Sequence, residues 1–222
     1  MKRLLAVLTI GLVLAAVSGR AEAQITHDFI ERYARVQILN PASASDLVEL
    51  SEASWDFGTF DKDLSTNLGA TSGLARQQTT AGLVDDILTV SGSQAVGLSR
   101  EDAGDLTQGF AGTRSLVSFS LVSAGTYELT VQAATGSAAL LVESVDQEEY
   151  LLSVSSPVAG ATYTGQLPGP GAYRIFVQTE VQRNLADPYD VGASLDFSLV
   201  VRSGSALAHE AVLWEKVKSL FR

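Results

Sequence analysis

The chain has 222 residues, a formal net charge of −10 at pH 7 and no cysteine. An acidic surface repels phosphate backbones, so this composition argues against nucleic acid as a partner. The lack of cysteine excludes disulfide bonds, and the fold must therefore depend on packing and strand pairing alone.

Residues 1–23 have the order of a secretory signal peptide. A basic start (2–3) precedes an apolar stretch (4–17), and small residues at Ala21 and Ala23 occupy the two positions that a signal peptidase reads. The apolar stretch is shorter than the ~20 residues that a membrane-spanning helix needs. We predict cleavage before Gln24 and export to the periplasm or the extracellular medium. No later stretch is apolar enough to span a membrane, so we expect no transmembrane segment in the mature chain.

Strand patterns dominate the chain from about residue 84 onward. Apolar residues alternate with polar ones in 117–121 and 127–133, on both sides of a short turn at 123–125 that contains glycine. This pattern predicts a half-buried β-hairpin. Comparable runs follow at 140–145, 150–154, 163–167, 173–177 and 195–201. Short strands between Gly- and Pro-marked turns are typical of an all-β, antiparallel β-sandwich, and we predict a jelly-roll-like one.

Two segments share residues at identical spacing. In both, the shared series is Leu, Gly and Tyr: Leu121, Gly125 and Tyr127 recur as Leu167, Gly171 and Tyr173. We interpret the segments as equivalent hairpins, in which a glycine turn places a tyrosine at the first inward position of the next strand. The repeat is evidence about architecture and carries no chemistry.

Four features occur in a fixed order within residues 114–202. They are an Ala-Gly turn with its strand (123–127), a middle strand (140–145), a Gly-Tyr turn (170–173) and a closing strand (196–201). In this order they resemble the bacterial pre-peptidase C-terminal domain, a β-sandwich of exported proteins. The resemblance implies a non-catalytic appendage of the kind found on secreted enzymes, and this chain itself encodes no peptidase.

The N-terminal part of the mature chain has weaker patterns. A short helix over 28–35 with Thr26 as its cap and an edge strand over 34–39 both fit, and both remain open. We treat 24–45 as an N-terminal segment and 46–204 as the sandwich domain.

Further strands are expected at 47–50, 55–60 and 87–90, and polar, Gly-rich loops at 67–80 and 99–113. Because this part lacks the apolar density of a second core, we expect it to supply the remaining strands of one larger sandwich.

Residues 205–222 change to a helical period. Their apolar residues recur at three- and four-residue spacing: Leu207, Ala211, Trp214, Val217 and Phe221. This spacing predicts a C-terminal amphipathic α-helix. The helix either packs on the sandwich, the usual fate of such a stripe, or docks on a partner or membrane surface.

No residue set has the spacing of a catalytic site. The two histidines, His27 and His209, lie near opposite ends of the mature chain, and there is no Gly-x-Ser-x-Gly or His-Glu-x-x-His motif. Carboxylates are abundant, but their spacing singles out no pair for glycoside hydrolysis. We therefore predict a protein that is not an enzyme, and we assign no catalytic residue and no cofactor.

One run of alternating oxygen ligands resembles the start of a calcium loop. It consists of Asp61, Asp63, Ser65 and Asn67. Thr66 stands where such a loop needs glycine, and Ser72 stands where it needs glutamate. We interpret the run as a solvated polar loop and predict no metal site.

Trp55 and Phe176 are the candidates for a ring on which a sugar stacks. Phe176 points away from the side of its strand that holds Ile175 and Val177. The predicted terminal helix is an obvious cover for it, so packing is the favoured role.

These patterns predict an exported, non-catalytic β-sandwich that binds a ligand or has a structural role at the cell envelope or outside the cell. A polysaccharide or an envelope protein is the expected partner, and the ligand-binding residues stay unassigned. Two alternatives remain: a subunit that docks through 207–221 and, less favoured, a carboxylate-dependent glycan hydrolase.

Overall fold

The computed structural model describes residues 24–43, 47–101, 107–184 and 190–204. These residues form strands joined by turns, and the described part of the chain contains no helix. The strands are β1 (Ile25–Leu39), β2 (Leu47–Ser54), β3 (Gly58–Leu68), β4 (Thr71–Val84), β5 (Ile87–Arg100), β6 (Gln108–Leu121), β7 (Gly125–Thr135), β8 (Ala138–Ser144), β9 (Glu149–Ser155), β10 (Thr162–Leu167), β11 (Gly171–Arg183) and β12 (Val191–Ser203).

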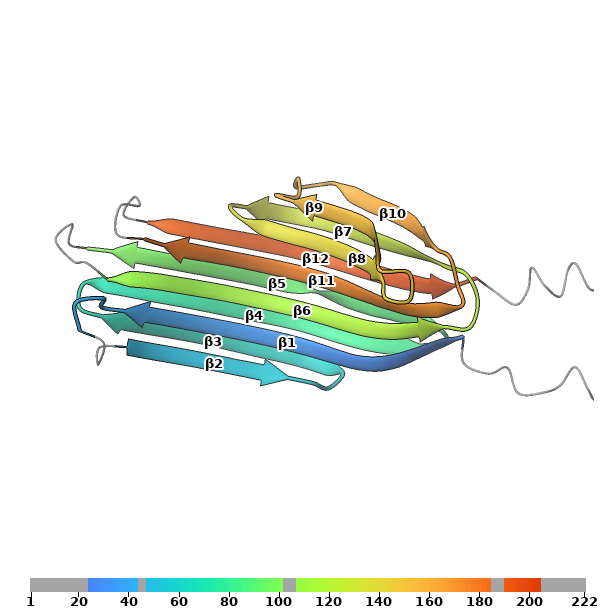
Figure 1. The fold of residues 1–222 in the computed structure, drawn as a ribbon, viewed down its shortest axis with the longest axis horizontal. Helices are drawn as coiled ribbons and strands as arrows, with labels where there is room; N and C mark the ends of the chain where they lie inside the picture. The colour runs from blue at the N-terminus through green and yellow to red at the C-terminus, as the bar shows by residue number, and fades with distance from the viewer. Residues whose placement is uncertain (1–23, 44–46, 102–106, 185–189, 205–222) are drawn as a thin grey trace, which may run out of the picture.

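Two antiparallel, six-stranded sheets pack face to face (Figure 1). Sheet A has the order β2-β1-β6-β11-β8-β9, and sheet B has the order β10-β7-β12-β5-β4-β3. From β5 to β12 the pairing is nested, since β5 pairs with β12, β6 with β11, β7 with β10, and β8 with β9. Nested pairing of this kind is the topology of an eight-stranded jelly roll. The predicted all-β sandwich is therefore confirmed, with β1–β2 extending sheet A and β3–β4 extending sheet B.

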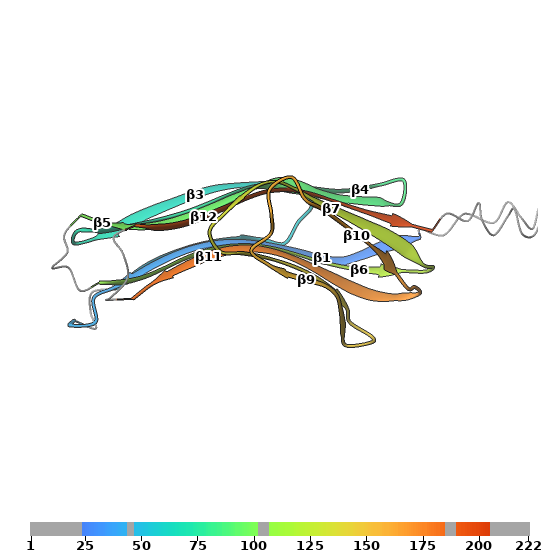
Figure 2. The same cartoon turned by 90° about the horizontal axis from the view of Figure 1, so that it is seen from above.

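Both sheets bow in the same direction along their strands (Figure 2). Their ends bend toward the side of sheet A. The outer surface of sheet A is therefore concave along the strands, and that of sheet B is convex.

The hairpin predicted around residues 123–125 does not form. Residues 117–121 end β6 in sheet A, whereas 127–133 belong to β7 in sheet B. Alternation shows which side chains face inward, but both sheets share one interior, so the pattern is the same whether the next strand lies beside its predecessor or opposite it. Gly125 is needed at this corner, because a Cβ there would lie 2.6 Å from the Arg202 carbonyl oxygen.

The repeated Leu-Gly-Tyr segments are both corners between sheets. The first leads from sheet A to sheet B, and the second leads back from β10 to β11. In both, the tyrosine is buried: Tyr127 is 4% exposed and Tyr173 is 1% exposed. The inward placement of the tyrosines is confirmed, but the interpretation as hairpins is wrong.

The N-terminal part forms strands throughout its described residues. β1 lies between β2 and β6, so the region 28–35 is not a helix and 34–39 is not an edge strand. The sandwich thus begins at Ile25, within the segment 24–45 that the sequence sets apart. The loop expected at 67–80 is the end of β3 and most of β4, and residues 99–100 and 108–113 of the loop expected at 99–113 belong to β5 and β6.

The interior consists of two apolar clusters separated by polar side chains. The larger cluster includes Phe119 and Tyr173, whose rings stack with centroids 5.8 Å apart, and the smaller one includes Val36 and Leu98. We call the side chains between them the polar belt: Arg32, Gln77, Thr79, Gln94, Thr113, Ser115 and Thr179, all at most 1% exposed.

Hydrogen bonds inside the polar belt join the two sheets. Gln77 Nε2 donates to Ser115 Oγ at 2.8 Å, and Gln94 Nε2 donates to the Val177 carbonyl at 3.2 Å. Arg32 Nη1 donates to the Gly58 carbonyl at 2.7 Å. Burial lowers the pKa of Arg32, and nearby Asp56 opposes this shift. Most buried polar groups in proteins are hydrogen-bonded, as these nitrogens are, although Arg32 Nε, Gln77 Oε1 and Gln94 Oε1 have no hydrogen-bond partner among the described residues.

The predicted helix over 205–222 and His209 lie outside the described residues. No helix within the described ranges is long and apolar enough to cross a membrane.

Candidate binding face

The outer surface of sheet A gathers aromatic and charged side chains. Successive side chains of a strand point to opposite faces of the sheet, so the residues on either side of each buried residue face outward. Strand register then sets the outward residues side by side: Glu31, Leu116, Phe176 and Leu141 form one row, and Tyr33, Arg114, Gln178 and Ala139 form the next. We call this surface the aromatic face and define it by Phe29, Tyr33, Phe110, Tyr150, Phe176, Arg35, Arg114 and Arg174.

The ring of Phe110 lies across its own strand. A Cβ at Gly112 would lie 2.7 Å from Phe110 Cζ and 3.0 Å from Cε1, so the ring occupies the space that any other side chain at this position would need. Gly112 is two residues further along β6 and therefore on the same side of the sheet. The glycine lets the ring rest on the outer side of the sheet, where Phe110 is half-buried. The Arg35 guanidinium carbon is 5.9 Å from the ring centroid.

Carboxylates orient two of the three arginines. Arg114 Nη2 lies 2.5 Å from Glu31 Oε1, and its guanidinium is 6.0 Å from the centroid of the Tyr33 ring. Arg35 Nε lies 3.1 Å from Glu49 Oε1. Burial lowers the pKa of Arg35, but Tyr33 and Glu49 outweigh that effect and raise the pKa above its ordinary value. Ion pairs this exposed add little stability, but they limit where a guanidinium points.

Arg174 differs from the other two arginines. No carboxylate in the described part of the chain lies within ion-pair distance of it. Phe176 is two residues away on the same strand and the same side. The guanidinium is therefore free to donate hydrogen bonds to a ligand beside that ring.

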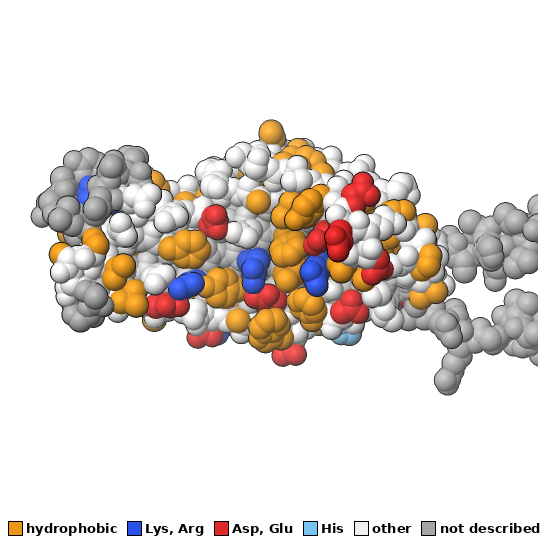
Figure 3. All heavy atoms as spheres, viewed as in Figure 1, with side chains coloured by type: hydrophobic (Ala, Val, Ile, Leu, Met, Phe, Trp, Pro, Cys, Tyr) orange, Lys and Arg blue, Asp and Glu red, His pale blue; other side chains and the backbone are white. Residues whose placement is uncertain are grey.

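Figure 3 shows the aromatic face from outside. Hydrophobic side chains run along its middle, and basic and acidic side chains lie between them. Aromatic rings offer broad apolar surfaces, and guanidinium, amide and carboxylate groups offer hydrogen bonds at their margins. This chemistry suits a ligand that has apolar faces and polar edges.

The outer surface of sheet B has a different character. Its outward residues are mostly short and polar, and they hydrogen-bond across strands, as in Thr59–Thr80 (3.2 Å) and Thr130–Thr162 (3.1 Å). Such pairs stabilise the sheet. Each such pair uses one hydroxyl donor within the protein.

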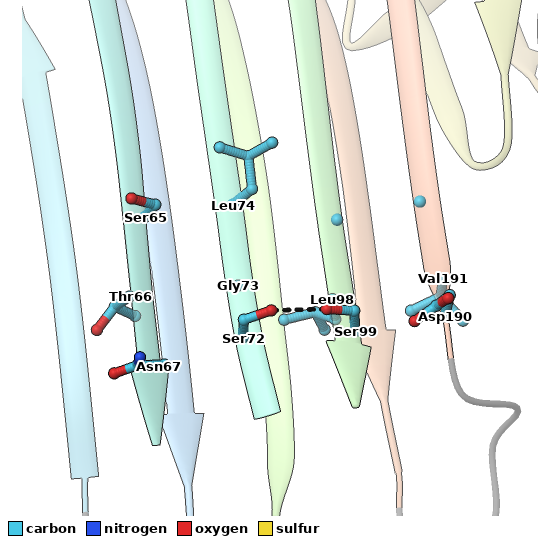
Figure 4. A pocket seen from close by; sticks show the side chains of 12 residues that line it. Ser65, Thr66, Asn67, Ser72, Gly73, Leu74, Leu98, Ser99, Asp190 and Val191 are labelled. Carbon is cyan, nitrogen blue, oxygen red and sulfur yellow. Dashed lines mark hydrogen bonds between the residues drawn. The ribbon is translucent and has the colours of Figure 1, made fainter. Parts of the chain in front are cut away.

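A shallow depression of about 780 Å³ lies on sheet B near the ends of β3, β4, β5 and β12 (Figure 4). Short polar side chains line much of it, and Ser72 Oγ and Ser99 Oγ hydrogen-bond to each other at 2.6 Å. It contains no aromatic ring, and Asp190 is the one charged residue in its lining. The depression is therefore a weaker candidate than the aromatic face.

The run of oxygen ligands at 61–67 forms part of strand β3 and is not a loop. Its members alternate outward along an extended strand, so successive ones lie about 7 Å apart and cannot converge on one ion. Asp63 accepts a hydrogen bond from Arg76 Nε at 3.0 Å, and Asp61 accepts one from Gln78 Nε2 at 3.3 Å. Among the described residues, no group of His, Cys, Asp or Glu is placed to hold a metal ion.

The structure separates the two predicted stacking candidates. Phe176 is half-buried within the aromatic face, and Trp55 is 61% exposed in the turn after β2. His27 forms an edge-to-face contact with Phe57 at 4.5 Å between centroids, which is a packing role. The expected cover for Phe176 falls on residues outside the described ranges.

Sequence reasoning missed Phe29, Tyr33 and Phe110. These residues lie where the sequence allowed a helix or a loop. The available signal was the alternation along 30–38, in which Arg32 breaks the otherwise apolar inward series. A buried arginine in that series hides a strand from a search for hydrophobic periodicity.

No family model and no curated protein matches this sequence. Among solved structures, a variant of a family 29 carbohydrate-binding module complexed with cellulohexaose is 12% identical, and the match covers 82% of this chain and 94% of that one at a TM-score of 0.22. TmCBM61 in complex with β-1,4-galactotriose is 13% identical over 55% of this chain and 86% of that one, at a TM-score of 0.25.

A GH31 α-xylosidase from Xanthomonas citri is 7% identical over 65% of this chain, at a TM-score of 0.22. The match spans 28% of the xylosidase chain. Likenesses of this size carry no inference about function, which must come from the residues of this chain.

Proposed function

We propose that the protein is an exported, non-catalytic module that binds polysaccharide through the aromatic face. The observation that carries the proposal is the array of outward rings on sheet A, above all Phe110, which lies across Gly112. The export part rests on the signal-peptide pattern of residues 1–23.

The spacing of the rings favours a chain of sugars over a single sugar. Phe176 pairs with Leu116, and Leu116 lies six residues from Phe110 along β6. Six residues of extended strand correspond to about 20 Å. A ligand that contacts both rings must therefore be extended, and the concave curvature of sheet A follows such a ligand along the strands (Figure 2).

The charged residues favour recognition of polar edges. Arg35 and Arg114 each form an ion pair with a carboxylate, whereas Glu143, which lies opposite Arg174 on β8, is not within ion-pair distance of it. Hydroxyl groups of a polysaccharide accept hydrogen bonds from guanidinium and donate them to carboxylates. The face thus combines stacking surfaces with donors and acceptors at their margins.

Binding to a panel of soluble polysaccharides tests the proposal. We would measure the affinity of the exported protein by calorimetry, using neutral glucan, mannan and galactan and one acidic polysaccharide. Phe110→Ala and Phe176→Ala should each lower the affinity for the bound polysaccharide about tenfold, the effect of losing a central aromatic contact.

The matched control is Thr80→Ala on sheet B, where the side chain is exposed and hydrogen-bonded to Thr59. This variant should bind like the unaltered protein. The proposal fails if no polysaccharide in the panel binds, or if both ring variants fold normally and keep full affinity.

A further inference from the structure

Gln24, the residue that follows the predicted cleavage site, is held by hydrogen bonds at each of its backbone polar groups. Its backbone nitrogen donates to Asp86 Oδ1 at 2.9 Å, and its carbonyl accepts from the Val122 nitrogen at 3.1 Å. Its side-chain Oε1 accepts from Ser123 Oγ at 2.9 Å. The next residue, Ile25, is 1% exposed and belongs to the larger apolar cluster. Ile25, the second residue after the predicted cleavage site, is thus the first residue of the apolar core.

Asp86 reaches Gln24 from the other sheet. It lies in the two-residue turn between β4 and β5, where Asp85 and Asp86 have φ angles of 49° and 58°. Two positive φ values define the type I′ turn, which usually contains Asn-Gly. Aspartate in the left-handed region costs free energy, so a compensating role for its side chain is expected. Asp86 Oδ1 also lies 3.5 Å from the Ile25 nitrogen, so both first nitrogens of the fold face this carboxylate.

We propose that Asp86 is a binding site for the new N-terminus that signal peptidase creates. Hydrolysis adds water across the Ala23–Gln24 bond, leaving a carboxylate on Ala23 and an α-ammonium group on Gln24. That ammonium group forms an ion pair with Asp86 in the exported protein. The proposal depends on the predicted cleavage and is independent of polysaccharide binding.

Cleavage strengthens a contact that the amide already makes. The amide of the uncut chain offers one hydrogen and no net charge, whereas the ammonium group offers three hydrogens and a positive charge. Charge-assisted hydrogen bonds are roughly twice as strong as neutral ones. Gln24 is half-buried, which limits screening of the pair by solvent. In the mature protein the N-terminus of sheet A is therefore bound to the β4–β5 turn of sheet B more strongly than Gln24 is in the precursor.

Two measurements on the exported protein test the proposal. Mass analysis of the N-terminus should find a chain that begins at Gln24. Thermal unfolding is then compared for chains that begin at Gln24 and at Ala23, each with Asp86 intact and as Asp86→Asn. In the longer chain the charged amine is moved one residue away from the carboxylate.

Asp86→Asn should lower the Tm of both chains, and the loss should be about 2–4 °C larger in the chain that begins at Gln24 than in the chain that begins at Ala23. A difference of this size is expected for the loss of one charge interaction in a protein of this length. Asparagine tolerates positive φ as well as aspartate does, so backbone strain does not explain a loss. Asp85→Asn, in the same turn, should shift both chains equally. The proposal is overturned if the exported chain begins elsewhere, or if Asp86→Asn changes both chains by the same amount.

Discussion

Gly112 has an unusual role for a glycine in the middle of a strand. Glycine there weakens a sheet because it adds backbone entropy and offers no side chain for packing. In this protein the Phe110 ring fills that space on the outer side of sheet A. Gly112 thus lowers the strand propensity of β6 but allows the Phe110 ring to lie against the outer side of the sheet.

Gly112→Ala separates binding from stability. Its Cβ would require the far end of the Phe110 ring to lift, which costs little because the side chain can rotate. We expect the Tm to stay within about 2 °C while polysaccharide affinity falls severalfold. Gly82→Ala is the control, since its Cβ would meet only Thr89 Oγ1 at 3.8 Å. Unchanged affinity of Gly112→Ala would argue that the orientation of the ring is unimportant.

The buried tyrosines predict a loss of stability at alkaline pH. Burial raises the pKa of Tyr127 and Tyr173, and nearby Asp146 raises that of Tyr173 further. In the unfolded chain both phenols ionise near pH ~10, whereas in the folded protein they hold their protons to higher pH. The free energy of unfolding is therefore unaffected by them below pH ~10 and falls as pH rises from there through the raised pKa values.

Urea unfolding at pH ~8 and ~10.5 measures this effect. Tyr173→Phe should lose less stability between the two pH values than the unaltered protein does. Tyr150→Phe, at a tyrosine that is 62% exposed, should lose as much as the unaltered protein. Equal losses in all three proteins would contradict the assignment.

At the scale of whole elements, β1 carries more of the fold than its sequence indicates. It pairs with β2 on one side and β6 on the other, and it contributes inward residues to both apolar clusters. A chain that begins at residue 46 would leave one edge of β6 unpaired and both clusters open. We expect this chain to lack cooperative unfolding by circular dichroism. A chain of residues 24–204, which keeps all twelve described strands, is the comparison and should unfold cooperatively.

The sequence predicts the strands of the larger cluster well and those near the polar belt poorly. Val177 ends the predicted run in β11, yet the strand continues to Arg183 through Thr179 and Val181. Thr179 hydrogen-bonds to Thr113 at 2.6 Å inside the sandwich, so a polar residue occupies a core position. Periodicity of hydrophobic residues stops at such positions even though the backbone does not. The same reason hides β4, where Gln77 and Thr79 point inward.

Candidate site residues were harder to predict than strands. Phe176 follows from alternation within one strand, but its neighbours on the aromatic face come from β1 and β6, far away in sequence. Which strands lie side by side depends on the nested order of the jelly roll. Alternation within each strand does not contain that order.

On the scale of the whole molecule, the two outer surfaces differ in what they offer a partner. Sheet A is concave and aromatic, and sheet B is convex and covered by short polar side chains that pair with each other (Figure 2). Tight binding sites concentrate aromatic and arginine side chains, as sheet A does. The proposed binding of polysaccharide therefore belongs to the outer surface of sheet A, and sheet B offers few comparable side chains.

The polar belt has a consequence for how the molecule opens. A continuous apolar interior unfolds as one unit, but here hydrogen-bonded Gln77, Gln94 and Ser115 separate a large cluster from a small one. The small cluster buries fewer side chains, so the end of the sandwich that contains it should open at a lower free energy than the other end. Backbone amides around Val36 and Leu98 would then exchange with deuterium sooner than those around Phe119 and Leu199, and the belt would mark the boundary of the part that opens first.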